Sequence, residues 1–143
     1  MKLFGKSENV PTEGYKVLKS ETEWREALSP EQFRIMFEHA TERPGTSPLL
    51  QEKRAGTFAC AACGQPAYEA STKFESGTGW PSFWAPIEGG TATNTDRSYF
   101  MVRTEVHCAN CGAHQGHVFD DGPAPTGQRY CINGLALKFK PQE

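Results

Sequence analysis

The apolar residues in the first part of the chain have the spacing of short amphipathic helices. One helical face is predicted by apolar residues at i, i+3, i+4 and i+7, which are Phe33, Met36, Phe37 and Ala40. The stretch 29–32 (Ser-Pro-Glu-Gln) precedes them and offers an N-cap, a proline at the first helical position and a capping glutamine. Ser20 and Glu23 form an earlier capping-box pattern. We therefore predict two short helices, with Arg43-Pro44-Gly45 ending the second, whose apolar face packs in the core.

After residue 55 the apolar runs become short, and glycine and proline punctuate them. The pattern predicts strands at residues 57–60, 99–108, 117–119 and 130–139. The clearest alternation is in 99–108, and Gly134 is a point at which the last strand can be interrupted. This organisation predicts a mainly β domain over residues 20–143, preceded by a polar N-terminal arm at residues 1–19.

Composition excludes several classes of protein. The chain has 143 residues, which suits one domain, and its 15 basic and 17 acidic residues give a formal net charge of -2. This balance provides no electrostatic surface for nucleic acid or an anionic membrane. No apolar run is long enough to span a bilayer, and the N-terminus turns polar at Ser7-Glu8-Asn9, before a signal-peptide core could form. We therefore expect a cytoplasmic protein with reduced cysteines.

Four of the five cysteines lie in two near-identical C-x-x-C-G turns, Cys60/Cys63 and Cys108/Cys111. Two such turns supply four thiolates for a closed tetrahedral site, the pattern of structural zinc. The 44 residues between the turns make this a clip between distant hairpins rather than a small zinc finger. A redox C-x-x-C motif is the alternative, but it requires a βαβ setting that this pattern lacks, and iron is a minor alternative.

The unpaired cysteine is Cys131, in Arg129-Tyr130-Cys131-Ile132-Asn133. In an extended strand, Arg129, Cys131 and Asn133 share one face. The thiolate is the reactive form of cysteine, and a nearby positive charge lowers the thiol pKa. We therefore predict that Cys131 is a nucleophile whose pKa is lowered by Arg129.

Two further stretches could complete such a site. Trp80, between Gly79 and Pro81, suits an exposed aromatic wall for a methyl or sulfur group as well as it suits the core. His114 and His117 flank Gly116 after the second cysteine turn. Alone they fit structural roles, but beside one unpaired thiol a role in proton transfer is equally supported.

Taken together, these motifs resemble the methionine-R-sulfoxide reductase family, the B class. The matching stretches cover about residues 28–139 and are Thr41-Glu42-Arg43-Pro44, Cys60-x-x-Cys63, Ser76-Gly77-Thr78-Gly79-Trp80-Pro81-Ser82-Phe83, Cys108-x-x-Cys111, Gly116-His117-Val118-Phe119-Asp120-Asp121-Gly122-Pro123 and Arg129-Tyr130-Cys131-Ile132-Asn133. The resemblance implies two antiparallel sheets with short N-terminal helices packed on them, and a structural Zn²⁺ in the four-cysteine clip.

The resemblance also implies an activity, the reduction of methionine-R-sulfoxide, mainly in oxidised proteins or peptides, as repair after oxidative stress. Cys131 matches the nucleophile that becomes a sulfenic acid. The groups that match substrate orientation, proton transfer and thiol activation are His114, His117, Asn133, Arg129 and Asp121. Trp80 and Phe119 match the pocket for the methyl group.

One position departs from the family pattern. Many members have a cysteine between the two glycines of the S-G-x-G-W-P-S-F stretch, where this chain has Thr78. The sequence therefore predicts a cycle in which an external thiol reduces the Cys131 sulfenic acid. Thioredoxin, a glutaredoxin or a small thiol could each act as reductant.

The main alternative is a non-catalytic binding module that is held by the metal clip and grips a partner with Trp80. In that case Cys131 would be an inert core thiol. A hydrolase with a cysteine nucleophile is weaker, because no clear oxyanion hole is present in the sequence.

Overall fold

The computed structural model describes residues 10–143. The first elements in chain order are two short helices. They are α1 (Glu21–Ala27) and α2 (Pro30–Glu38), and both predicted capping boxes are formed. In each box the serine hydroxyl accepts a hydrogen bond from the amide of the third helical residue. The side chain of that residue, Glu23 or Gln32, accepts a hydrogen bond from the serine amide. Two backbone amides that have no partner within the helix are thereby satisfied.

The predicted end of the second helix was several residues too late. The helix stops at His39, which adopts a left-handed conformation with φ of 56°. The following amide, that of Ala40, donates back to the Arg34 carbonyl at 3.0 Å, a geometry that closes a helix end. The chain therefore leaves the helix early enough for Thr41 to line the pocket described below.

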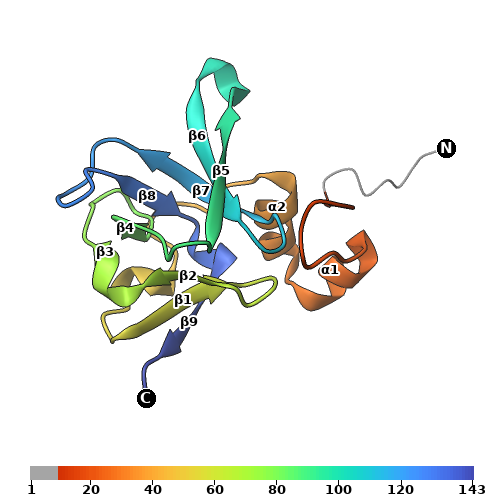
Figure 1. Cartoon of the computed structure of the whole chain (residues 1–143), viewed down its shortest axis with the longest axis horizontal. Coiled ribbons are helices and arrows are strands. Elements are labelled where there is room, and N and C mark those ends of the chain that lie inside the picture. Colours follow the sequence, from red (N-terminus) through yellow and green to blue (C-terminus); the bar gives the residue numbers. More distant parts are fainter. Residues whose placement is uncertain (1–9) are drawn as a thin grey trace.

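The strands form two antiparallel sheets, as expected from the resemblance. Their bounds are β1 Gly56–Cys60, β2 Pro66–Glu69, β3 Lys73–Phe74, β4 Ser82–Phe83, β5 Thr91–Asp96, β6 Arg103–Cys108, β7 His114–Phe119, β8 Arg129–Ile132 and β9 Leu137–Pro141. The small sheet has the order β2-β1-β9 and the large one β3-β4-β8-β7-β6-β5. Figure 1 shows both helices on one side of the molecule and the β5–β6 hairpin projecting from its body.

Two of the predicted strands differ from the structure. The run 130–139 is divided by a 3-10 turn at Gly134–Ala136, so that β8 joins the large sheet and β9 the small one. Gly134 is required there, because a Cβ on it would lie 1.9 Å from the Ser47 hydroxyl. In the run 99–108 only β6 is a strand, and the residues before it form the tip of the hairpin. Strands β2 to β5 were not predicted, since they are very short or largely polar.

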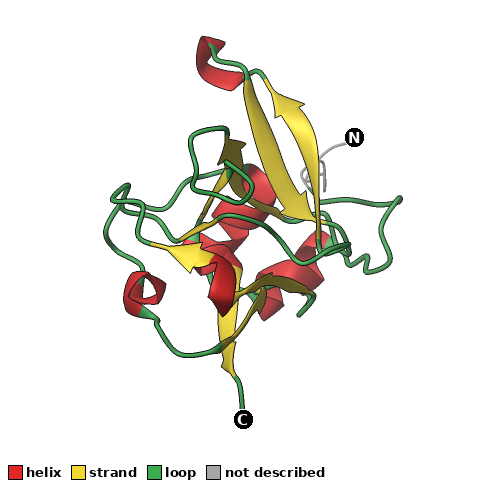
Figure 2. Cartoon of the chain, turned by 60° about the vertical axis from the view of Figure 1, so that its left-hand side comes forward, coloured by secondary structure: helices red, strands yellow, loops and turns green. Residues whose placement is uncertain are grey.

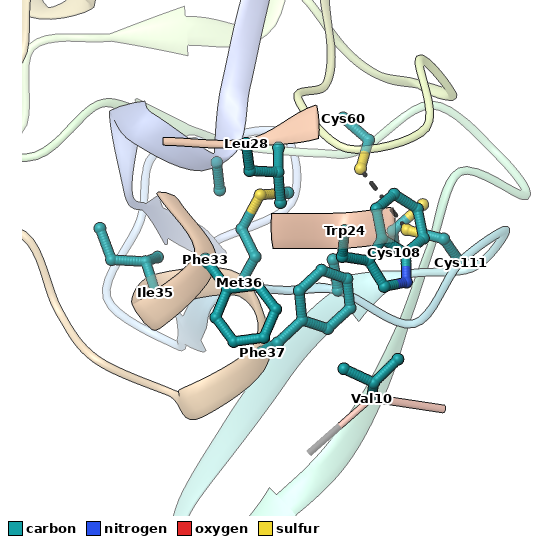
Figure 3. Close-up of a cluster of buried hydrophobic side chains, with 12 residues drawn as sticks. Val10, Trp24, Leu28, Phe33, Ile35, Met36, Phe37, Cys60, Cys108 and Cys111 are labelled. Carbon is teal, nitrogen blue, oxygen red and sulfur yellow. Dashed lines mark hydrogen bonds between the residues drawn. The ribbon is translucent and has the colours of Figure 1, made fainter. Parts of the chain in front are cut away.

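Two buried clusters hold the structure together. One lies between the sheets and is made of Phe58, Ala67, Tyr68, Phe83, Val106, Ile132 and Leu137. The other, drawn in Figure 3, packs the helices against the cysteine turns, with Trp24 and Phe37 5.0 Å apart between ring centroids. Truncating such an aromatic side chain typically costs about 3–5 kcal/mol.

The described part of the predicted arm lies along the second cysteine turn. Val10 is buried in the helical cluster, and the Val17 amide donates to the Asn110 carbonyl at 3.0 Å. Residues 1–9 of the predicted arm lie outside the described residues. Within 10–143, neither helix has the length and apolarity needed to cross a membrane.

Candidate active site

Polar side chains that are distant in the sequence lie together on one face of the large sheet. His117 on β7 is directly opposite Cys131 on β8, and Phe119 is opposite Arg129. Glu105 on β6 is opposite His117. Paired residues on neighbouring strands project to the same side of a sheet, so these side chains share one face. The predicted common face of Arg129 and Cys131 fits this register, and the opposite face packs into the core between the sheets.

A shallow pocket of about 120 Å³ opens on this face. It is lined by Thr41, Trp80, Arg103, Gly116, His117, Phe119, Cys131 and Asn133. The Trp80 indole nitrogen donates to the Glu42 carbonyl at 3.0 Å, which fixes the ring at the edge of the pocket. Of the two roles considered for Trp80, the wall of a pocket is therefore the observed one. A Cβ at Gly116 would lie 2.1 Å from the Cys131 carbonyl oxygen, so only glycine permits this approach of β7 to β8.

The pKa of the Cys131 thiol depends on two opposing effects. Burial raises the pKa of the Cys131 thiol, and this effect exceeds the opposing effects of the Arg129 charge and the Thr78 hydroxyl. Arg129 is also engaged elsewhere, since it donates to Asp121 through Nε at 2.8 Å and Nη2 at 3.1 Å. Arg129 thus acts to lower the thiol pKa, as predicted, but the net shift is upward because the effect of burial is larger. Arg129 lowers the free-energy cost of ionising the Cys131 thiol, but part of that cost remains.

His117 has a carboxylate partner that the sequence did not reveal. Its Nε2 lies 2.7 Å from Asp96 Oδ2 on β5. The hydrogen bond from His117 keeps the pKa of Asp96 well below its usual range. Burial lowers the pKa of His117, while Asp96 acts to raise it. Asp96 thus orients the imidazole and favours its protonated form.

A second carboxylate, Glu105, holds two histidines. Its oxygens lie 2.8 Å from Nδ1 of His114 and 3.0 Å from Nδ1 of His107. Burial would raise the pKa of Glu105, but the hydrogen bonds from the two histidines outweigh it and lower the pKa to about 2. His114 is only 2% exposed and lies behind the pocket, with its ring centroid 5.5 Å from that of His117.

The other predicted site residues lie around the same pocket. Asn133 is buried, accepts from the Glu42 amide and donates to the Gln115 carbonyl, each at 2.9 Å. Asp121 is exposed and outside the pocket, where it holds Arg129, whose guanidinium lies 4.5 Å from the Phe119 ring centroid. The sequence analysis missed Asp96, Arg103 and Glu105. Arg103 and Glu105 lie two positions apart on β6, so the period of two in a strand could have indicated that they share a face.

The four paired cysteines come together away from this pocket. Their sulfurs all lie within 4.8 Å of one another, with Cys60 and Cys111 at 3.7 Å and Cys63 and Cys108 at 3.6 Å. Zinc–sulfur bonds of about 2.3 Å give a tetrahedron with edges of about 3.8 Å, so the cluster fits a tetrahedral metal ion. Asn110 donates to two of the sulfurs, from its amide to Cys108 and from its side chain to Cys63. The cluster joins the loop after β1 to the loop after β6.

The amino-acid sequence is similar to those of known proteins over most of its length. The SelR domain model matches residues 28–141. A protein of Pseudomonas putida named peptide methionine sulfoxide reductase MsrB is 54% identical over 129 residues, which are 90% of this chain and 97% of the relative. Proteins of the same name from Agrobacterium fabrum and Methanosarcina barkeri are each 53% identical, over 88% and 89% of this chain and 94% and 90% of the respective relative.

Proposed function

Because this chain belongs to the SelR domain family and is a peptide-methionine (R)-S-oxide reductase, we propose that Cys131 reduces the sulfoxide and that an external thiol restores it. The observation that carries this proposal is the pairing of Cys131 with His117 in a pocket that Trp80 and Phe119 wall. A binding module would have no use for a thiol facing a histidine held by a carboxylate.

The chemical step follows from this geometry. The Cys131 sulfur attacks the sulfoxide sulfur, and protonated His117, held by Asp96, gives a proton to the sulfoxide oxygen. The oxygen then passes to the Cys131 sulfur, while the S–O bond of the substrate and the sulfur–sulfur bond formed by the attack both break. Methionine leaves and Cys131 becomes a sulfenic acid, the reversible first stage of cysteine oxidation.

The surrounding side chains support this step in different ways. Trp80 and Phe119 contact the methyl group and sulfur of the substrate. Arg129, held by Asp121, stabilises the thiolate that attacks, and the Thr78 side chain also acts to lower the thiol pKa. Asn133 and His114 keep the pocket in shape, through the Glu42 segment and the Glu105 carboxylate respectively.

The sulfenic acid is reduced from outside the chain. The other four cysteines are grouped in the metal-type cluster, and Thr78 occupies the position facing Cys131. A thiol of thioredoxin, a glutaredoxin or a small molecule would attack the sulfenic sulfur and release water. A second thiol would then open the mixed disulfide and free Cys131.

Mass spectrometry of the intact protein after one turnover, without reductant, tests the proposal. We expect a gain of one oxygen on Cys131 with the R epimer of a methionine sulfoxide peptide and no change with the S epimer. A loss of two hydrogens would instead reveal an internal resolving thiol. No change with either epimer would contradict the reductase chemistry.

Thr78→Cys is the matched variant for this experiment. The Thr78 side chain is near enough to Cys131 to lower the thiol pKa, so a thiol at this position is placed to attack the sulfenic acid. We expect this variant to lose two hydrogens after one turnover with the R epimer, at an initial rate within about threefold of the parent. A persistent sulfenic acid in the variant would show that the two side chains do not meet.

Asp96→Asn is expected to lower the rate of the first step by about ten- to a hundredfold. Asp96 acts to raise the pKa of His117, so its neutral replacement lowers that pKa and reduces the protonated fraction at neutral and alkaline pH. The loss should therefore grow as the pH rises, and the alkaline limb of the profile should move to lower pH. The measurement is the pH profile of single-turnover rates, and a uniform loss at every pH would contradict this role. Asp120→Asn is the control, because Asp120 is bonded to Gln128 outside the pocket.

Zinc is the metal that we propose for Cys60, Cys63, Cys108 and Cys111. With four protein ligands it supplies a cross-link and no open position for chemistry. Four reduced thiols and an external thiol reductant both fit a cytoplasmic role in repairing oxidised proteins.

A further inference from the structure

The tip of the β5–β6 hairpin is unusually apolar for a solvent-exposed turn. The hairpin tip consists of Tyr99, Phe100, Met101 and Val102, which are 79%, 107%, 46% and 69% exposed. Among the large hydrophobic side chains of residues 10–143, the only other exposed one is Leu18, at 44%. Scattered exposed hydrophobic residues are ordinary, but a cluster at one projecting point indicates an interaction surface.

Folding alone does not account for these residues. None of the four belongs to either buried cluster. Tyr99 and Phe100 have φ of 56° and 59°, in the left-handed region that favours glycine and asparagine. Small or polar residues would suit this turn better in both conformation and hydration. Two aromatic residues, Tyr99 and Phe100, thus occupy positions whose left-handed backbone conformation is unfavourable for them.

The hairpin tip is continuous with the pocket. Val102 directly precedes Arg103, which lines the pocket. Arg103 lies 3.4 Å from Asp96, and Asp96 also accepts from the Ser98 amide at the foot of the tip. Figure 2, turned by 60° from Figure 1, again shows the hairpin standing out from the body.

The pocket itself holds little more than one side chain. Its volume of about 120 Å³ is below the range of about 300–1,000 Å³ typical of pockets that enclose a whole ligand. The residues on either side of a bound methionine sulfoxide must therefore lie on the surface outside. The hairpin tip lies one to four residues along the chain from Arg103 at the pocket. Since an extended chain advances about 3.4 Å per residue, substrate residues about three to five positions from the sulfoxide are the ones that can reach it.

We propose that the hairpin tip binds apolar residues flanking the sulfoxide in extended or unfolded polypeptide substrates. This proposal rests on the proposed function and adds a preference for apolar residues beside the methionine sulfoxide. Aromatic rings give a large apolar contact area, and the flexible Met101 side chain adapts to varied partners. The ligand of the hairpin tip is a polypeptide. A polypeptide whose methionine sulfoxide lies in the pocket can contact the pocket and the hairpin tip at the same time.

The test compares three substrates of the full-length protein with a small dithiol as reductant. Two are peptides of equal length with a central methionine-R-sulfoxide, flanked three to five positions away by leucine and phenylalanine or by serine and glycine. The third is N-acetyl-methionine-R-sulfoxide amide. The variant is Tyr99→Asn with Phe100→Gly, which removes both rings and suits the left-handed backbone. Leu18→Ser is the control for loss of an exposed hydrophobic side chain.

We expect wild-type protein to prefer the apolar peptide by about tenfold in kcat/KM, through KM. The double variant should lose this preference and keep its rate on the small substrate, while Leu18→Ser changes neither. Loss of rate on all three substrates, or an unchanged preference, would overturn the proposal. So would a tip-dependent dimer in sedimentation with unchanged peptide preference. Failure of the wild-type protein on all three substrates would count instead against the proposed function.

Discussion

Replacing Cys131 with serine is expected to abolish sulfoxide reduction, with a loss of at least about 10⁴-fold in kcat/KM. The thiol is the only group at the centre of the pocket that can accept the sulfoxide oxygen by forming a sulfenic acid. A serine hydroxyl ionises far less readily than a thiol and is a much weaker nucleophile towards sulfur. Burial, which already raises the pKa of the Cys131 thiol, would hinder an alkoxide still more.

The measurement is single-turnover reduction of a methionine-R-sulfoxide peptide, with peptide binding measured separately. Binding and thermal stability should remain close to those of the parent, because serine is nearly isosteric with cysteine and Cys131 lies outside both buried clusters. Thr78→Ser is the control, since it retains the hydroxyl that faces Cys131. Residual turnover in Cys131→Ser above the rate of the peptide alone would mean that another group is the nucleophile.

Removing the zinc that we propose for the four-cysteine cluster is expected to unfold the domain or leave it without fixed packing. Cys60, Cys108 and Cys111 are almost completely buried and belong to the same cluster as the two helices. Without a metal ion, four thiols held within 4.8 Å would lose their cross-link, and any that ionised would repel one another. Binding of structural zinc contributes about 10–16 kcal/mol in small domains, which matches or exceeds the stability of about 5–15 kcal/mol of a typical protein.

Two measurements check this expectation. Metal content is determined before and after chelation, and thermal unfolding is followed by near- and far-ultraviolet circular dichroism. Cys63→Ser should reproduce the loss seen on chelation, because it removes one ligand at a partly exposed position. Cys131→Ser serves here as the matched control, since it removes a thiol outside the cluster. A metal-free protein with an unchanged unfolding transition would show that the cluster does not support the fold.

Local patterns in the sequence determined the features that depend on neighbouring residues. The capping boxes at Ser20 and Ser29 begin the two helices as predicted, because their hydrogen bonds span only three residues. Each C-x-x-C-G turn brings two thiols together locally, and the repetition of the turn predicted that the four cysteines form one cluster. The family resemblance named Cys131, His117, Trp80 and Phe119, and the structure brings all four to one pocket.

The tertiary structure decided what depends on pairing between distant strands. Asp96 became the partner of His117 only through the order β5-β6-β7, and β5 is too polar to be recognised as a strand. The pKa of Cys131 depends on a balance between burial and the Arg129 charge. The sequence of the strand that carries Cys131 does not determine how deeply its thiol is buried. The alternation at residues 100–106 predicted a strand throughout, yet the chain turns before Arg103 and leaves Phe100 exposed. Periodicity specifies which side chains share a face, whereas the packing of the whole chain decides which face is buried and where a strand stops.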